Sequence, residues 1–220
     1  MPQSPTSRFN ISSDLCQIIR LQIANGDLAP GKHVNEVHLA EKLDVSRTPL
    51  REALSQLTAE GLLESKPRRG FFTKELTIDE VKQLYPLRAF LDPQALRMAG
   101  MPSQKRIADL RRINEQIAKT HGRPARAVDL DDQWHRLLLI DCPNRILLDF
   151  IDQLIWKSRR YEYAYLMQSG NLDMATTEHD AILDALEKTD LATACRMLKQ
   201  NMTSAREPLL AWLRPQEENQ

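Results

Sequence analysis

Apolar residues recur at helical spacing along almost the whole chain, and only one short stretch departs from this pattern. In the first third, helical periodicity covers residues 11–25, 36–43 and about 47–60. Residues 62–65 and 71–74 then read as two short strands around a turn. The pattern predicts three helices followed by a β-hairpin.

Beyond residue 77 the pattern is helical throughout. Breaks rich in Gly, Pro, Asn or Asp divide it into six expected helices with no strand between them. Six helices without a sheet describe a bundle. These helices are expected near residues 78–99, 104–120, 125–141, 145–168, 174–188 and 190–212.

The helices at 36–43 and 47–60 are joined by only a few residues. Ser46 is placed to cap the second helix, because its hydroxyl can accept a hydrogen bond from an unpaired amide of the first turn. Thr48 and Arg51 point away from the apolar face of this helix, and Arg47 stands in its exposed first turn. This is a helix-turn-helix arrangement, whose second helix fits the roughly 12 Å wide major groove of DNA. The apolar face, which should pack inward, consists of Leu50, Ala53, Leu54 and Leu57.

The expected hairpin behind this helix is basic at its turn, residues 66–70, which read Lys-Pro-Arg-Arg-Gly. Such cations would meet phosphate or the minor groove, so the hairpin is expected to be a wing. The predicted fold class is therefore mainly α: an N-terminal winged helix-turn-helix and a C-terminal all-helical bundle of about six helices that binds an effector.

These elements divide the chain into four expected segments. Residues 1–10 read as a flexible polar arm, and residues 11–75 as the winged helix-turn-helix DNA-binding domain. Residues 76–214 form the expected helical effector-binding and dimerisation domain. Residues 215–220 are the expected tail.

Composition and charge narrow the class of protein. Hydrophobic residues make up 42% and charged residues 27% of the 220 residues, as in a folded globular protein. A formal net charge of zero argues against coating nucleic acid or a membrane by bulk charge, but not against a local basic surface. Three scattered cysteines, no signal peptide and no apolar run of roughly 20 residues lead us to expect a cytoplasmic protein that does not enter a membrane.

The first domain resembles a known family of regulators. The stretch from Gly26 to Phe72, with its segments VSRTPLREAL, EGLL and PRRG, is similar to the DNA-binding domain of GntR-type bacterial regulators. The remainder, through DDQWHRLLL and EHDAILDAL, resembles the FCD effector domain of the FadR subfamily. Six expected helices rather than seven make it more similar to the VanR-type branch.

The resemblance implies a homodimer that binds a pseudo-palindromic double-stranded DNA operator, and a small molecule in the helical domain that changes the affinity. Arg suits guanine because its fork meets O6 and N7 together. Family members often carry a basic or polar residue where this chain has Val37, so one DNA contact is expected to differ. The residues expected at the DNA are Ser46, Arg47, Thr48, Arg51, Arg68, Arg69 and Gly70.

Polar residues fall on inward faces of three expected helices of the bundle. Asp131 and His135 are four residues apart on one face, and His179 and Asn201 lie on two others. Buried polar groups need partners, and a divalent ion such as Zn, Ni or Mn would satisfy these together. These positions match the Asp/His/His/His metal set of FCD domains except that the last histidine is Asn201. The alternative is a hydrogen-bonded core cluster without metal.

Arg88, on the first helix of the bundle, is the candidate for holding an anionic effector. A guanidinium binds a carboxylate in bidentate fashion, which favours a small organic acid. The alternative is an arginine at the surface or in a salt bridge. No organic cofactor is expected.

The leading hypothesis is a ligand-responsive transcription factor, which we expect to repress a metabolic operon. A second is an enzyme for metal-assisted hydrolysis, but no general base or nucleophile motif accompanies the site. A third is an architectural DNA-binding protein without an effector. Stabilisation by small organic acids would separate the first from the third.

Overall fold

The computed structural model describes residues 5–169 and 173–217. The chain divides after Leu76 into two compact units, Met1–Leu76 and Thr77–Gln220. Each unit has its own buried core.

The first unit contains three helices and a hairpin. Its elements are α1 (Pro5–Ala24), α2 (Glu36–Lys42), α3 (Arg47–Ala59), β1 (Leu63–Lys66) and β2 (Gly70–Thr73). The apolar faces of α1 and α3 pack together, and a bidentate ion pair from Arg20 to Glu60 joins them at 2.8–3.1 Å. Leu50, Ala53, Leu54 and Leu57 are fully buried, as the spacing predicts.

Two local expectations in this unit need correction. Residues 5–10 are helical rather than a flexible arm, because Pro5 stands at the first position of α1, where its fixed φ favours a helix; residues 1–4 lie outside the described part of the chain. Each strand is also shifted by one residue from its expected position. A β-turn closed by the hydrogen bond from Arg69 N to Lys66 O (3.0 Å) leaves Lys66 and Gly70 paired.

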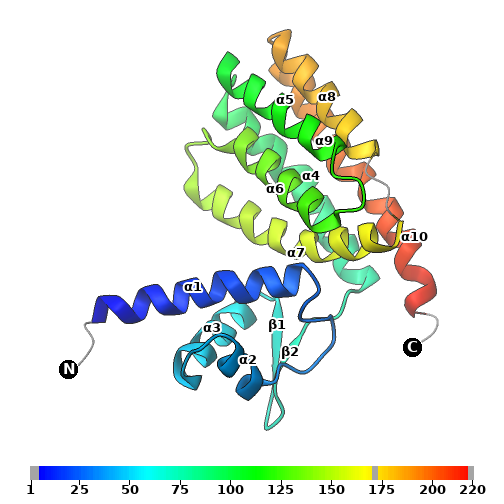
Figure 1. The fold of residues 1–220 in the computed structure, drawn as a ribbon. Coiled ribbons are helices and arrows are strands. Elements are labelled where there is room, and N and C mark those ends of the chain that lie inside the picture. The colour runs from blue at the N-terminus through cyan, green and yellow to red at the C-terminus, as the bar shows by residue number, and fades with distance from the viewer. Residues whose placement is uncertain (1–4, 170–172, 218–220) are drawn as a thin grey trace. The chain divides into compact units, whose positions relative to one another are not determined.

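The second unit is a helical bundle. Helix α4 packs against α7 and α9, and α5 contacts both α6 and α8 (Figure 1). Its core is apolar around Trp134, Leu110 and Leu183. The helices are α4 (Ile78–Ala99), α5 (Gln104–Ala118), α6 (Pro124–Leu139), α7 (Arg145–Ser169), α8 (Asp173–Glu187), α9 (Leu191–Ser204) and α10 (Arg206–Glu217).

The predicted fold class is confirmed, with one change at the end of the chain. The helix expected at 190–212 divides at Ala205 into α9 and α10. Pro208 explains the division, since a proline ring clashes with the carbonyl four residues earlier, here that of Ser204. The described bundle thus has seven helical segments, and a count of six no longer favours the VanR-type branch.

Helical structure also extends further toward the end of the chain than expected. Residues 215–217, which were expected to begin a tail, belong to α10, and residues 218–220 are outside the description. None of the described helices is both long enough and apolar enough to cross a bilayer.

Candidate DNA-binding surface and metal centre

Helix α3 presents an exposed polar edge at its N-terminal end. Ser46, Arg47, Thr48 and Arg51 are all exposed, because the opposite side of the helix is buried against α1 and the hairpin. Ser46 occupies the N-cap position with extended backbone, but its side chain makes no capping hydrogen bond, contrary to our expectation. Its hydroxyl is therefore available for another partner.

Arg51 is oriented by a residue that sequence reasoning did not single out. Its Nε lies 3.3 Å from Oε2 of Glu36, which is mostly buried at the start of α2. The position of Glu36 is set in turn by Asn35, whose Oδ1 accepts from the backbone N–H groups of Val37 and His38 at 3.1 Å each. Val37 itself is exposed at 52%.

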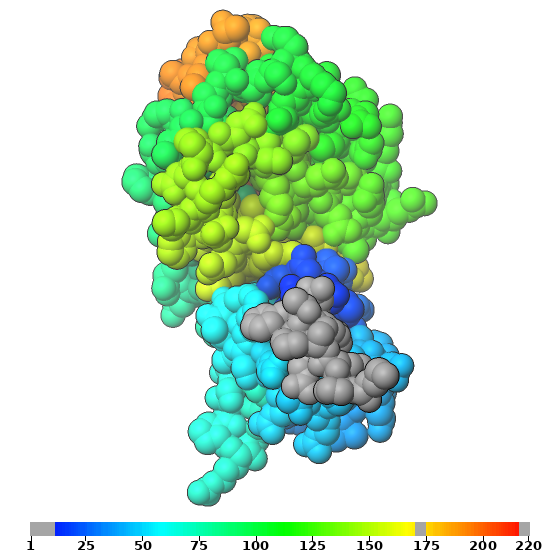
Figure 2. Space-filling model, turned by 90° about the vertical axis from the view of Figure 1, so that its left-hand side faces the viewer, coloured from blue at the N-terminus to red at the C-terminus, as the bar shows by residue number. Residues whose placement is uncertain are grey.

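The hairpin tip carries the cations that the sequence indicated. Figure 2 shows the hairpin as a projection of the first unit, in the cyan-green colour of residues near 70. Arg68 and Arg69 are exposed, and Arg69 and Lys66 also lie over the Phe72 ring, at 5.5 and 4.6 Å from its centroid. Arg68 has φ 60°, in the left-handed region, and Gly70 has φ 84°. With Pro67 before it, Arg68 occupies the third position of a type II turn.

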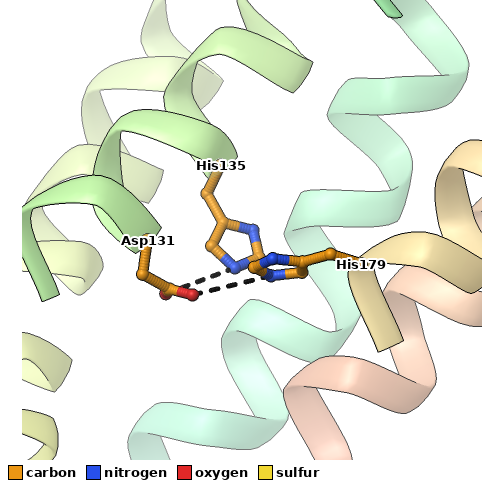
Figure 3. Close-up of side chains that lie close together, drawn as sticks. All are labelled: Asp131, His135 and His179. Carbon is orange, nitrogen blue, oxygen red and sulfur yellow. Dashed lines mark ion pairs between the residues drawn. The ribbon is translucent and has the colours of Figure 1, made fainter. Parts of the chain in front are cut away.

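Inside the bundle, Asp131, His135 and His179 come together. Figure 3 shows both imidazoles directed at the Asp131 carboxylate. Nε2 of His135 lies 3.6 Å from Oδ2, and Nε2 of His179 lies 3.5 Å from Oδ1. One ligand atom from each residue falls within 4.8 Å of the others. The spacing fits three side chains around one ion.

Asn114 on α5 determines which nitrogen of His179 is free. Nδ1 of His179 lies 3.0 Å from Oδ1 of Asn114, and an amide oxygen only accepts. Nδ1 therefore carries the proton, which leaves a lone pair on Nε2, facing Asp131. The ring also stacks on Trp134 at 3.8 Å between centroids. A histidine that is oriented through its second nitrogen is typical of a metal ligand.

Burial sets the protonation of the three groups. It lowers the pKa of His179 to about 3 and that of His135 well below its ordinary value, where Arg88 adds to the effect. Both imidazoles are neutral near pH 7, as metal binding requires. Burial and the nearby Glu162 raise the pKa of Asp131 well above its ordinary value. A cation beside Asp131 would reverse this shift.

Asn201 lies at the wall of the adjoining cavity. Its Nδ2 donates to Oε2 of Glu178 at 2.9 Å, while its Oδ1 is buried and has no hydrogen-bond partner. The cavity, of about 140 Å³, is also lined by Asp131 and His135. An unsatisfied buried oxygen beside two candidate ligands fits a site that binds something further.

Arg88 lines the same cavity but is not free. It is 2% exposed, its Nη2 donates to Oδ2 of Asp92 at 2.9 Å, and its Nη1 donates to Oγ of Ser158 at 3.2 Å. Only Nε lacks a partner. The structure thus includes the salt bridge that was the alternative for Arg88, and it leaves one donor toward a ligand.

Comparison with known proteins gives the family. Residues 11–73 match the model of the bacterial regulatory proteins of the gntR family, and residues 83–204, more than half of the chain, match the FCD domain. The chain belongs to the GntR family of regulators with an FCD domain. It is a transcriptional regulator with a helix-turn-helix for DNA, and not an enzyme.

Individual relatives of this GntR/FCD chain agree with the assignment. The Nta operon transcriptional regulator of Aminobacter aminovorans is 38% identical over 146 residues, covering 61% of this chain and 70% of its own. The transcriptional repressor RspR of Escherichia coli is 26% identical, covering 90% of this chain and 88% of its own. The structure of E. coli McbR/YncC is similar in fold, with a TM-score of 0.81 at 21% identity over 92% of this chain and 98% of that one.

The sequence analysis did not identify three residues at the metal centre and cavity of the FCD domain. Asn114 was detectable, because it is the single polar residue in the buried stripe Ile107, Leu110, Asn114 and Ile117. The carboxylates of Glu162 and Glu178 also line the cavity. No local pattern marks either of them, since only helix packing brings them there.

Proposed function

We propose that the chain is a repressor of a metabolic operon, released from its operator when a small carboxylate-containing effector binds the helical domain through a metal ion. The observation that carries this proposal is the buried Asp131–His135–His179 group beside a cavity with unpartnered polar atoms. Two relatives support it: the transcriptional repressor RspR, and a protein of Paenarthrobacter nicotinovorans described as a probable D-xylose utilization operon transcriptional repressor.

For DNA binding we assign residues 11–75, in a homodimer that reads a pseudo-palindromic operator. The exposed edge of α3 would enter the major groove, and the hairpin tip would lie along the backbone or minor groove. Glu36 would position Arg51 for this contact. Such a regulator works in the cytoplasm, where bacterial DNA lies. The assigned contacts are Ser46, Arg47, Thr48, Arg51, Arg68, Arg69 and Gly70.

For metal binding and dimerisation we assign residues 76–214. Neutral imidazole and carboxylate ligands suit Zn, Ni or Mn, and Asp131, His135 and His179 would hold the ion. The free Oδ1 of Asn201 would complete the set through water, and its second lone pair would still accept from a ligand. When bound, the ion supplies positive charge at the cavity wall, which attracts an organic acid. Nε of Arg88 is the protein donor for the same acid.

Coupling to DNA would run through α7 to the start of α4, directly after the linker formed by residues 74–77. Glu162 of α7 accepts from Tyr85 Oη of α4 at 3.0 Å, beside the cavity. Its neighbour Tyr161 accepts from the backbone N–H of Thr77 at 3.1 Å and donates to Glu80. An effector that displaces α7 would therefore alter the first turn of α4. This change would favour one of two conformations of the linker over the other.

Operator binding by the variant Arg51→Ala tests the proposal. DNA duplexes selected by the wild-type protein from a random pool serve as probes at one fixed salt concentration. Loss of a bidentate base contact should cost about 1–3 kcal/mol, which is roughly 5- to 150-fold in affinity. The matched control is Arg112→Ala, an exposed arginine on α5 that forms an ion pair with Asp109. Unchanged affinity in Arg51→Ala, measured by fluorescence anisotropy, would contradict the assignment.

A further inference from the structure

Three carboxylates line the cavity without a matching cation. These are Asp131, Glu162 and Glu178. In the part of the chain that the structure describes, none of them forms an ion pair with Lys or Arg, and Asp131 lies beside two buried histidines that are neutral near pH 7. Arg88, the cation of the cavity wall, is already paired with Asp92. The wall therefore carries an excess of negative charge.

Neutral donors only partly satisfy this charge. Oε1 of Glu162 accepts from the hydroxyl of Tyr85 at 3.0 Å. Glu178 accepts from the amide of Asn201 and the hydroxyl of Ser204. A divalent ion at Asp131 would offset two of the three negative charges, which still leaves one. Glu162 and Glu178 are partly buried, and charge withdrawn from water without a counter-charge is costly, so the ligand group beside these two carboxylates should be cationic.

Two buried polar atoms without a hydrogen-bond partner give separate evidence on which groups the ligand carries. Nε of Arg88 is a buried donor without an acceptor, and Oδ1 of Asn201 is a buried acceptor without a donor. Both side chains line the cavity and are at least 96% buried, with exposures of 2% and 4%. A ligand that meets both needs an acidic end and an N–H end.

We propose that the effector is an aminocarboxylate: a small molecule with a carboxylate directed at Arg88 and the metal centre, and an ammonium group directed at Glu162 and Glu178. This deepens the proposed function and rests on it. The remaining wall is apolar, with Leu166, Met202 and Leu209, and the volume of about 140 Å³ suits a molecule of a few carbons.

Pairs of acids that differ only by an amino group provide the test. The probes are succinate with aspartate, glutarate with glutamate, and propionate with alanine, added to the full zinc-loaded chain. Isothermal titration and the shift in Tm give the affinities. In at least one pair the amino form should bind about tenfold more tightly or better, since a charge-assisted hydrogen bond contributes that much.

The variant Glu162→Gln distinguishes ligand contact from structure. The amide preserves the shape of the side chain and the acceptor for Tyr85, but it removes the charge. It should reduce the preference for the amino form to near unity by weakening the amino form, and it should not weaken binding of the plain acid, because a like charge is removed. The control is Asp149→Asn, an exposed carboxylate on the same helix, which should keep the full preference.

The outcomes separate this inference from the broader proposal. If plain acids bind as tightly as their amino forms, or if Glu162→Gln weakens both equally, the ammonium contact is wrong while an acid effector stands. If no probe binds, both the aminocarboxylate and the acid effector are wrong. Operator binding by the same preparation tests the DNA-binding role separately.

Discussion

At the scale of single residues, Asn114 determines how His179 meets its surroundings. Its oxygen accepts from Nδ1 of His179, and its Nδ2 donates to Thr176 O and to Asp180, each at 2.9 Å. These contacts orient both the amide and the imidazole. The lone pair of Nε2 therefore points at Asp131 before any ion binds, which lowers the entropic cost of forming the centre.

Replacing Asn114 with Ala should weaken metal binding about 10- to 100-fold, the usual cost of losing such a partner. The affinity for Zn is measured by competition with a chromophoric chelator. Asp180→Ala is the matched control, because it removes a contact of Asn114 but keeps the one to His179. Equal affinities of Asn114→Ala and the wild type would refute the orienting role of Asn114, and a wild type that binds no Zn, Ni or Mn would overturn the metal proposal.

At the scale of elements, the wing combines a tight turn with a strained cation. Arg68 takes a left-handed backbone conformation that costs a residue other than glycine about 1–2 kcal/mol. Glycine would relieve this strain but loses roughly 0.5–1 kcal/mol of conformational entropy. The presence of Arg at this position therefore fits a role at the DNA rather than in stability.

Arg68→Gly should stabilise the first unit by up to about 1 kcal/mol and weaken operator binding. The slope of log affinity against log salt concentration should also become smaller by about one. Native-state hydrogen exchange measures the stability of this unit, and operator titrations at several salt concentrations measure the slope. Arg68→Ala keeps the strain and should weaken binding without stabilising. If the salt dependence of operator affinity is unchanged in both variants, Arg68 does not contact the DNA.

At the scale of the whole molecule, the buried histidines make stability depend on pH. In the unfolded chain a histidine takes up a proton as the pH falls through about 6.5, whereas folded His179 does so only near pH 3. Between these values the unfolded state binds more protons, so the free energy of unfolding falls as the pH is lowered. One such histidine contributes about 1.4 kcal/mol per pH unit.

The metal-free protein should therefore lose stability from pH 6.5 to 4.5 more steeply than the variant His179→Phe, which keeps a ring to stack on Trp134. The comparison with a variant is needed because Asp132, whose pKa burial raises to about 6, gives the opposite slope between 3.8 and 6. Tryptophan fluorescence reports the second unit alone, which contains all three tryptophans. His121→Gln, at an exposed histidine, is the control. Equal slopes in wild type and His179→Phe would contradict the prediction.

Much of this architecture follows from local pattern. The periods of apolar residues predicted α2, α3 and the bundle helices, and Pro67 and Gly70 predicted the wing. The errors lie at ends: Pro5 extends α1 into the expected arm, and Pro208 divides the last helix. Both depend on where a single proline falls within a turn, which periodicity does not detect.

By itself the sequence determined the order of the elements, the exposed basic edge and the inward faces of the site residues, because these depend on neighbours a few positions apart. It also pointed to Asp131, His135 and His179 as a group, through their spacing and the family resemblance. Only the tertiary structure decided the partners of those residues. Asn114 and His179 are 65 positions apart, and Glu162 and Tyr85 are 77 apart. Contacts over such separations arise from helix packing, which also decides the charge of the cavity that they surround.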